Sequence, residues 1–159
     1  YMLGRLDMGY GAYTFLISSV FVARVATLPL LGNYARRHGV DSLLRFGGWG
    51  MIPVSGLWIL SDNIAYLFFL QILSGVVWAA WELAAQLLFF EAIKSEERTS
   101  VLTTFNLLNS AAAVLGSILG SGILDRNEAS TGAYWVLFGV SSILRGLTLI
   151  LLRRLKSTP

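Results

Sequence analysis

Long apolar stretches separated by short polar breaks dominate this chain. Five stand out, at residues 12–33, 43–60, 64–90, 101–124 and 133–152. Each is close to or above the roughly 20 residues that a helix needs to cross the ~30 Å hydrocarbon core of a bilayer. The breaks carry helix stop and start signals. Because strands of a membrane barrel are about ten residues long and alternate in polarity, the pattern predicts an all-α, polytopic bundle of about five transmembrane helices.

Composition supports a membrane protein. Hydrophobic residues make up 55% of the 159 residues and charged residues only 13%, against about 25% charged residues in soluble domains. The chain has no cysteine, which excludes thiolate metal sites and cysteine nucleophiles. The basic residues are dispersed among the connections, a pattern that gives little support to nucleic-acid binding. We predict no metal and no cofactor.

Positive charge gathers at alternate connections and so predicts an orientation. One side holds Arg36, Arg37, Arg45, Lys94, Arg98, Arg153, Arg154 and Lys156. The other side holds only Arg5 and Arg126. Because Lys and Arg are retained in the cytoplasm, we expect the N-terminus outside and the C-terminus in the cytoplasm. An odd number of helices agrees with that expectation.

Three ionisable residues lie within the apolar segments: Arg24, Glu82 and Arg145. A charge inside the membrane costs several kcal/mol on most estimates, about 2.5 to 3.5 by insertion scales, and therefore faces a cavity or a partner. Glu82 shares a polar and aromatic helix face with Gln71, Ser74, Gly75, Trp78, Ala85 and Phe89. Two interpretations stay open for Glu82, namely substrate or proton handling and structural pairing with a neighbouring helix.

Arg24 is the expected partner of Glu82. The first and third segments run in the same direction, and the two residues lie at depths that agree within about 5 Å at 1.5 Å per residue. The alternative for Arg24 is snorkelling toward the cytoplasmic interface, and Arg145 has the same alternative. Trp78 beside Glu82 is either a stacking platform or part of the packing.

The fourth segment has a face of small and polar residues. This face carries Asn106, Ser110, Ala113, Ser117, Gly120 and Ser121. Gly116 and Gly120 form a GxxxG pattern, which favours close packing of two helices. Asn106 and Asn109 are candidates for lining a cavity.

The first polar break resembles a known loop signature. The segment 32–39 is similar to the pattern Gly-x-Leu-Ala-Asp-Arg-x-Gly-Arg-Arg/Lys of the major facilitator superfamily. The residues that match are Gly32, Ala35, Arg37 and Gly39. The sequence departs from the pattern at Tyr34, Arg36, Val40 and Asp41. The segments 75–79, 82–84, 96–98 and 106–109 are similar to the tenth helix, the loop that follows it and the eleventh helix of such transporters.

The resemblance implies helices eight to twelve of a twelve-helix secondary transporter. The chain starts at Tyr1, and we expect that the seventh helix and the N-terminal half are missing. Such transporters bind a small solute between two halves that rock to alternate access. The resemblance thus implies a bilayer, the missing half, a solute and a proton as partners, a bacterial inner membrane as location, and a cytoplasmic gate at Gly32, Arg36, Arg37 and Gly39.

Two other functions are weighed beside transport. A non-transporting membrane scaffold or partner subunit would also be a helix bundle. An intramembrane enzyme would need a nucleophile–base pair or metal ligands at membrane depth. The segments hold no histidine and no pair of aspartates, so we expect that the protein is not an enzyme.

Overall fold

The computed structural model describes residues 2–3, 6–126 and 130–156, with side chains as far as residue 150. The described chain forms five helices: α1 (Tyr10–His38), α2 (Val40–Leu57), α3 (Ile64–Ala92), α4 (Arg98–Arg126) and α5 (Thr131–Lys156). No strand occurs within the described ranges. The predicted all-helical fold is confirmed.

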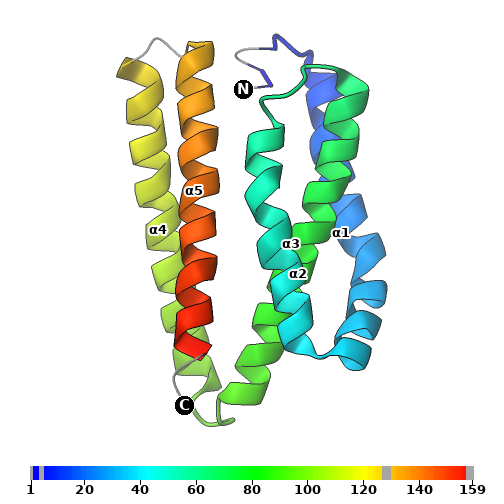
Figure 1. Ribbon diagram of the computed structural model, residues 1–159, viewed down its shortest axis with the longest axis vertical. Helices are drawn as coiled ribbons and strands as arrows, with labels where there is room; N and C mark the ends of the chain where they lie inside the picture. Colours follow the sequence, from blue (N-terminus) through cyan, green and yellow to red (C-terminus); the bar gives the residue numbers. More distant parts are fainter. Residues whose placement is uncertain (1, 4–5, 127–129, 157–159) are drawn as a thin grey trace.

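Successive helices run in opposite directions, so the connections alternate between the two ends of the bundle (Figure 1). The α1–α2 and α3–α4 connections lie at the same end as the end of α5. Arg37 and Lys94 belong to this end. The alternation that underlies the predicted charge asymmetry is therefore present in the fold.

Four of the five helices are long and apolar enough to cross a membrane: α1, α3, α4 and the Thr131–Ile150 part of α5. A helix of 29 residues, such as α1, is about 43 Å long at 1.5 Å per residue, which exceeds the ~30 Å hydrocarbon core. The protein is therefore an integral membrane protein whose helices contact lipid.

The second predicted span, α2, is long enough but is not among these four helices, because its composition is less apolar. It has 18 residues, about 27 Å at the helical rise, and carries Asp41 and Arg45 near its start. Its packing explains why a less apolar sequence is tolerated, because α1, α3 and α5 all pack against it. Gly47, Gly48 and Ser55 are buried there, so protein rather than lipid covers much of the helix.

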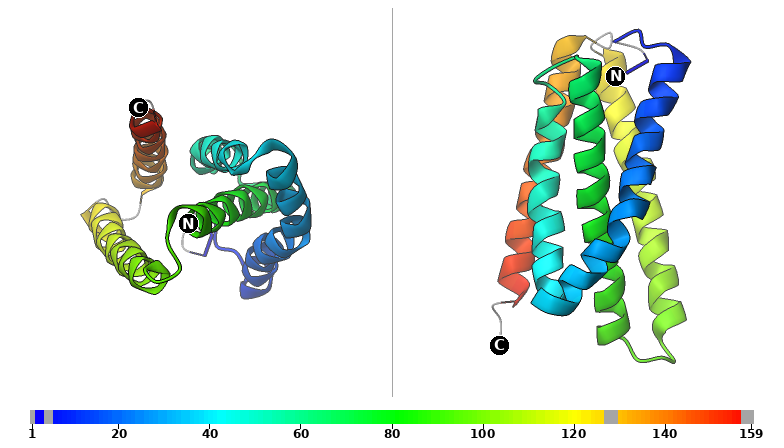
Figure 2. Two further views of the ribbon diagram at one scale, coloured as in Figure 1. Left: turned by 90° about the horizontal axis from the view of Figure 1, so that it is seen from below. Right: turned by 90° about the vertical axis from the view of Figure 1, so that its right-hand side faces the viewer.

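α3 is the centre of the bundle. α1 and α2 both pack along it, α5 packs on α2, and α4 packs mainly on α5. Viewed along the bundle, α4 and α5 lie to one side of the other three helices (Figure 2). None of the residues of α4 is buried. The tightly packed part of the protein is thus α1, α2 and α3.

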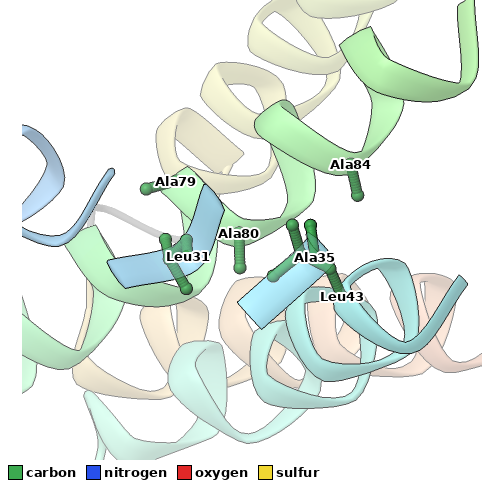
Figure 3. Close-up of a cluster of buried hydrophobic side chains, with 6 residues drawn as sticks. All are labelled: Leu31, Ala35, Leu43, Ala79, Ala80 and Ala84. Atoms are coloured by element: carbon green, nitrogen blue, oxygen red, sulfur yellow. The ribbon is translucent and has the colours of Figure 1, made fainter. Parts of the chain in front are cut away.

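Small side chains allow these three helices to approach closely. One buried cluster consists of Leu31, Ala35, Leu43, Ala79, Ala80 and Ala84, and Figure 3 shows the α3 alanines beside the α1 and α2 residues. At Gly75 on α3, a Cβ atom would lie 2.5 Å from the carbonyl oxygen of Val20 on α1. At Gly47 on α2, a Cβ would lie 2.6 Å from the backbone nitrogen of Trp81. Glycine at both crossings lets backbone pack against backbone, as small residues do between membrane helices.

The first connection differs from the sequence-based expectation. Instead of a polar loop after residue 33, α1 continues to His38 and α2 begins at Val40. Gly39 alone separates them, with φ 86° and ψ 155°, a conformation essentially restricted to glycine. Its N–H donates to the carbonyl of Ala35 at 2.8 Å. The polar residues after Asn33 form the exposed last turn of a helix that extends beyond its apolar part.

The close approach at Gly75 can be tested by substitution. Gly75→Ala is expected to lower the free energy of unfolding by roughly 1 to 3 kcal/mol, because the added methyl group clashes with the α1 backbone. Reversible unfolding in mixed detergent micelles, followed by tryptophan fluorescence, measures the change. Gly139→Ala is the matched control, since nothing lies within 4 Å of a Cβ there, and alanine stabilises an open helical position by about 0.5 to 1 kcal/mol. Equal losses in both variants would contradict the close approach.

Candidate functional site

Arg24 and Glu82 form an ion pair between two apolar helices. The Nη2 atom of Arg24 on α1 donates a hydrogen bond to Oε2 of Glu82 on α3. The two side chains are 29% and 43% exposed, respectively. The pairing predicted from their depths is present in the structure. The positive and negative charges offset each other where an isolated charge would be costly.

The helix crossing determines where the pair forms. Glu82 follows Gly75 by seven residues, or about two helical turns, so both face α1. Ala23 of α1 lies against Gly75 and is buried, and Arg24 is the next residue along α1. The close contact of α1 with α3 therefore brings the two charged side chains within reach of each other.

A small recess opens beside the ion pair. It has a volume of about 150 Å³ and is lined by Arg24, Leu28, Ala79, Glu82, Leu83 and Gln86. One water molecule takes up about 30 Å³ of liquid, so the recess has room for a few waters and is too small for a drug-sized solute.

A second and larger cavity lies between α2, α3, α4 and α5. It has a volume of about 1080 Å³. Trp78 and Arg145 form part of its wall, with the Arg145 guanidinium 5.8 Å from the centre of the Trp78 ring. Arg145 Nη1 also donates to the backbone carbonyl of Met51 at 3.2 Å. The hydroxyl-bearing residues Ser55, Ser74 and Ser141 also line it.

The predicted polar face of α3 is divided between these two places. Gly75 and Glu82 face α1, whereas Ser74 and Trp78 line the larger cavity. Phe89 stacks edge-on with Phe105 of α4, their ring centres 4.9 Å apart. The polar face of α3 expected from the sequence therefore contacts α1, the large cavity and α4 at different positions.

The amide side chains proposed as site residues lie apart from the ion pair. Gln71 is buried in α3, with 4% of its surface exposed, and lines neither the recess nor the large cavity. Asn106 and Asn109 are exposed on α4 and likewise line neither. The structure does not bring these three residues together with Glu82, and a role in binding stays a prediction for them.

The GxxxG pattern on α4 does not make a close helix contact within the described chain. A Cβ at Gly116 would meet no atom within 4 Å, and one at Gly120 would lie 3.6 Å from Leu137, an ordinary contact. Both glycines instead line the large cavity. A role of these glycines in helix packing stays a prediction.

The residues of the expected cytoplasmic gate lie at the end of α1. Gly32 and Arg36 line a hollow of about 590 Å³ that also includes Glu91 of α3. Arg36 donates to Asn33 Oδ1 at 2.7 Å, and Arg37 is exposed. Gly39 forms the turn itself. A gating role for this segment stays a prediction.

Arg145 is the residue whose setting the sequence did not reveal. It was expected to snorkel, yet it reaches across to α2 and lies over Trp78. Ser141 lies four residues before Arg145 on the same helix face, and both residues line the cavity. This spacing of two polar side chains is the sequence signal that could have indicated the position of Arg145. No group of three or more His, Cys, Asp or Glu side chains that could hold a metal ion occurs among the described residues.

Comparison with known proteins adds one distant relative. The chain is similar to Multidrug export protein EmrB of Haemophilus influenzae, with 25% identity over 122 residues. The match covers 77% of the chain and 24% of that protein, so the chain spans about a quarter of the length of its relative. No family model and no solved structure matches the chain.

The ion pair makes a clear prediction for stability. Arg24→Met or Glu82→Met alone is expected to lower the free energy of unfolding by roughly 1 to 3 kcal/mol, because either leaves a charge unpaired in apolar surroundings. The double variant is expected to lose less than the sum of the two. Unfolding in mixed detergent micelles gives the coupling energy. Glu82→Met combined with Arg45→Met is the control, and additive losses in both double variants would contradict the pairing.

Proposed function

We propose that the chain is part of a secondary transporter that moves a small solute across the membrane by alternating access. Three observations support this: helices long and apolar enough to span a bilayer, the similarity to a multidrug export protein, and the Arg24–Glu82 pair at membrane depth. The ion pair carries most of the proposal, because charged groups inside membrane helices mark ion and substrate pathways.

In the proposed mechanism, Glu82 couples solute movement to protons. The ionised carboxylate attracts Arg24 and holds α1 against α3. A proton on Glu82 removes the attraction, and Arg24 is then free to move. When the small recess beside the pair opens to one side of the membrane and then to the other, the carboxylate exchanges protons with each side in turn.

We further propose that the chain corresponds to helices eight to twelve of a transporter of the major facilitator type. The distant relative is about four times as long as the matched part, which leaves room for the other helices and for an N-terminal half. Such a half would face this bundle across the solute pathway. The proposed location is a bacterial inner membrane, with the Arg- and Lys-rich connections in the cytoplasm. The protein would have no enzymatic activity.

Transport assays with the complete gene product in proteoliposomes test this function. Aromatic dyes that are cationic, neutral or anionic serve as probes under an imposed pH gradient. The wild-type protein is expected to accumulate at least one dye. Glu82→Gln is expected to reduce gradient-driven accumulation at least tenfold, because the amide cannot carry the proton, while exchange of dye without a gradient continues.

Glu96→Gln in the exposed α3–α4 connection is the control and should transport like the wild type. Unchanged pH dependence in Glu82→Gln would remove the proposed coupling role. Failure of the wild-type protein to move any dye would overturn transport itself.

A further inference from the structure

We propose that the large cavity between α2, α3, α4 and α5 binds an organic anion, with the acid group on Arg145 and an apolar or aromatic body along the cavity wall. The idea that this anion is the transported solute rests on the proposed function. The idea that the cavity binds an anion does not depend on it.

The size of the cavity fits a ligand of this kind. Small-molecule sites typically have volumes of about 300 to 1,000 Å³ and apolar walls with a few polar groups. The cavity has about 1080 Å³ and is lined by side chains such as Val54, Leu137 and Leu144. It has space for a molecule with one or two aromatic rings, unlike the recess beside Glu82.

The charge of the cavity selects an anion. Among the described residues, the charged side chains in its wall are Arg126 and Arg145, and none of the described lining residues is a carboxylate. Arg145 makes no ion pair with any side chain that the structure describes. An arginine at this depth is energetically expensive without a counter-charge. A bound anion would supply that charge.

The hydrogen bonding of Arg145 leaves capacity for such a ligand. A guanidinium has five N–H donors in a planar fork that matches the two oxygens of a carboxylate. In the described structure, one of its nitrogens donates to Met51. The remaining donors provide the charge-assisted hydrogen bonds that an acid group accepts.

Trp78 gives the site its aromatic character. Its ring lies against the Arg145 guanidinium, 5.8 Å from ring centre to guanidinium carbon, which holds the cation at the cavity wall. Phe138 lines the same cavity. An aromatic acid therefore finds the cation and flat apolar surfaces together.

The contrast with Arg24 supports the assignment. Arg24 has its own carboxylate within the protein, whereas Arg145 has a backbone carbonyl and a ring. Of these two intramembrane arginines, Arg145 is the one whose positive charge is not balanced inside the described protein.

An acid group on an apolar body has two sources in a membrane, a dissolved aromatic carboxylate and an anionic lipid. Binding of tritiated 1-naphthoate to the complete gene product in phosphatidylcholine nanodiscs tests the first source. The uncharged 1-naphthamide is the ligand control. The same measurement in nanodiscs with phosphatidylglycerol tests the second, because a lipid in the cavity would displace the naphthoate.

Saturable binding of 1-naphthoate is expected, with weaker binding of the amide. Arg145→Gln is expected to weaken naphthoate binding roughly tenfold to a hundredfold, as loss of a charge-assisted hydrogen bond should. It should leave amide binding unchanged, which also shows that the variant is folded. Arg145→Lys should recover part of the loss. Arg45→Gln on α2, outside the cavity wall, should bind like the wild type.

Displacement by phosphatidylglycerol in the wild type but not in Arg145→Gln would assign the site to a lipid anion; no displacement would assign it to a solute. Equal naphthoate affinity in the wild type and Arg145→Gln overturns the proposal, as does preference for the amide. Binding is measured without a gradient, so loss of transport with intact binding would refute only the proposed function. If transport is intact and Arg145→Gln does not weaken naphthoate binding, only this inference is refuted.

Discussion

Opposite charges within apolar helices must form ion pairs, and this requirement determines how α1 and α3 are arranged at the centre of the protein. Arg24 and Glu82 are placed on α1 and α3 at matching depth, and they pair. The pair fixes the rotation of each helix about its own axis, because turning either one would expose an unpaired charge to lipid. Gly75 makes the arrangement sterically feasible, since it lets the α1 backbone approach α3.

α3 connects this paired region with the large cavity. Glu82 faces α1 and Trp78 faces the cavity, although only four residues, about 6 Å along the helix, separate them. A movement of α3 that follows breakage of the ion pair would therefore also move the Trp78 wall. On the other side of the cavity, α4 has no buried residue. One wall of the cavity is thus formed by the tightly packed helices α2 and α3, and the opposite wall includes the loosely packed helix α4.

Much of the fold could be predicted from the sequence, because membrane-spanning length is a one-dimensional property. The apolar segments matched five helices, and the depth of Arg24 and Glu82 correctly indicated a pair. Depth alone says nothing about which helix faces lie together, so the split between Glu82 and Trp78 on α3 was missed. For the same reason, the contacts of Arg145 with the Met51 carbonyl and the Trp78 ring could not be predicted. The single-residue turn at Gly39 was missed because polarity marks the end of the membrane core rather than the end of a helix.

The most direct test of the central claim uses the absence of native cysteine. Arg24→Cys and Glu82→Cys are introduced together, and the protein in native membranes is treated with a short, rigid bis-maleimide. If the two positions face each other between α1 and α3, mass spectrometry should find an intramolecular crosslink in most molecules. Arg24→Cys paired with Ser141→Cys on α5, which packs on α2 and α4, should give none. Absence of the first crosslink, or equal crosslinking in both pairs, would contradict an ion pair at this helix crossing.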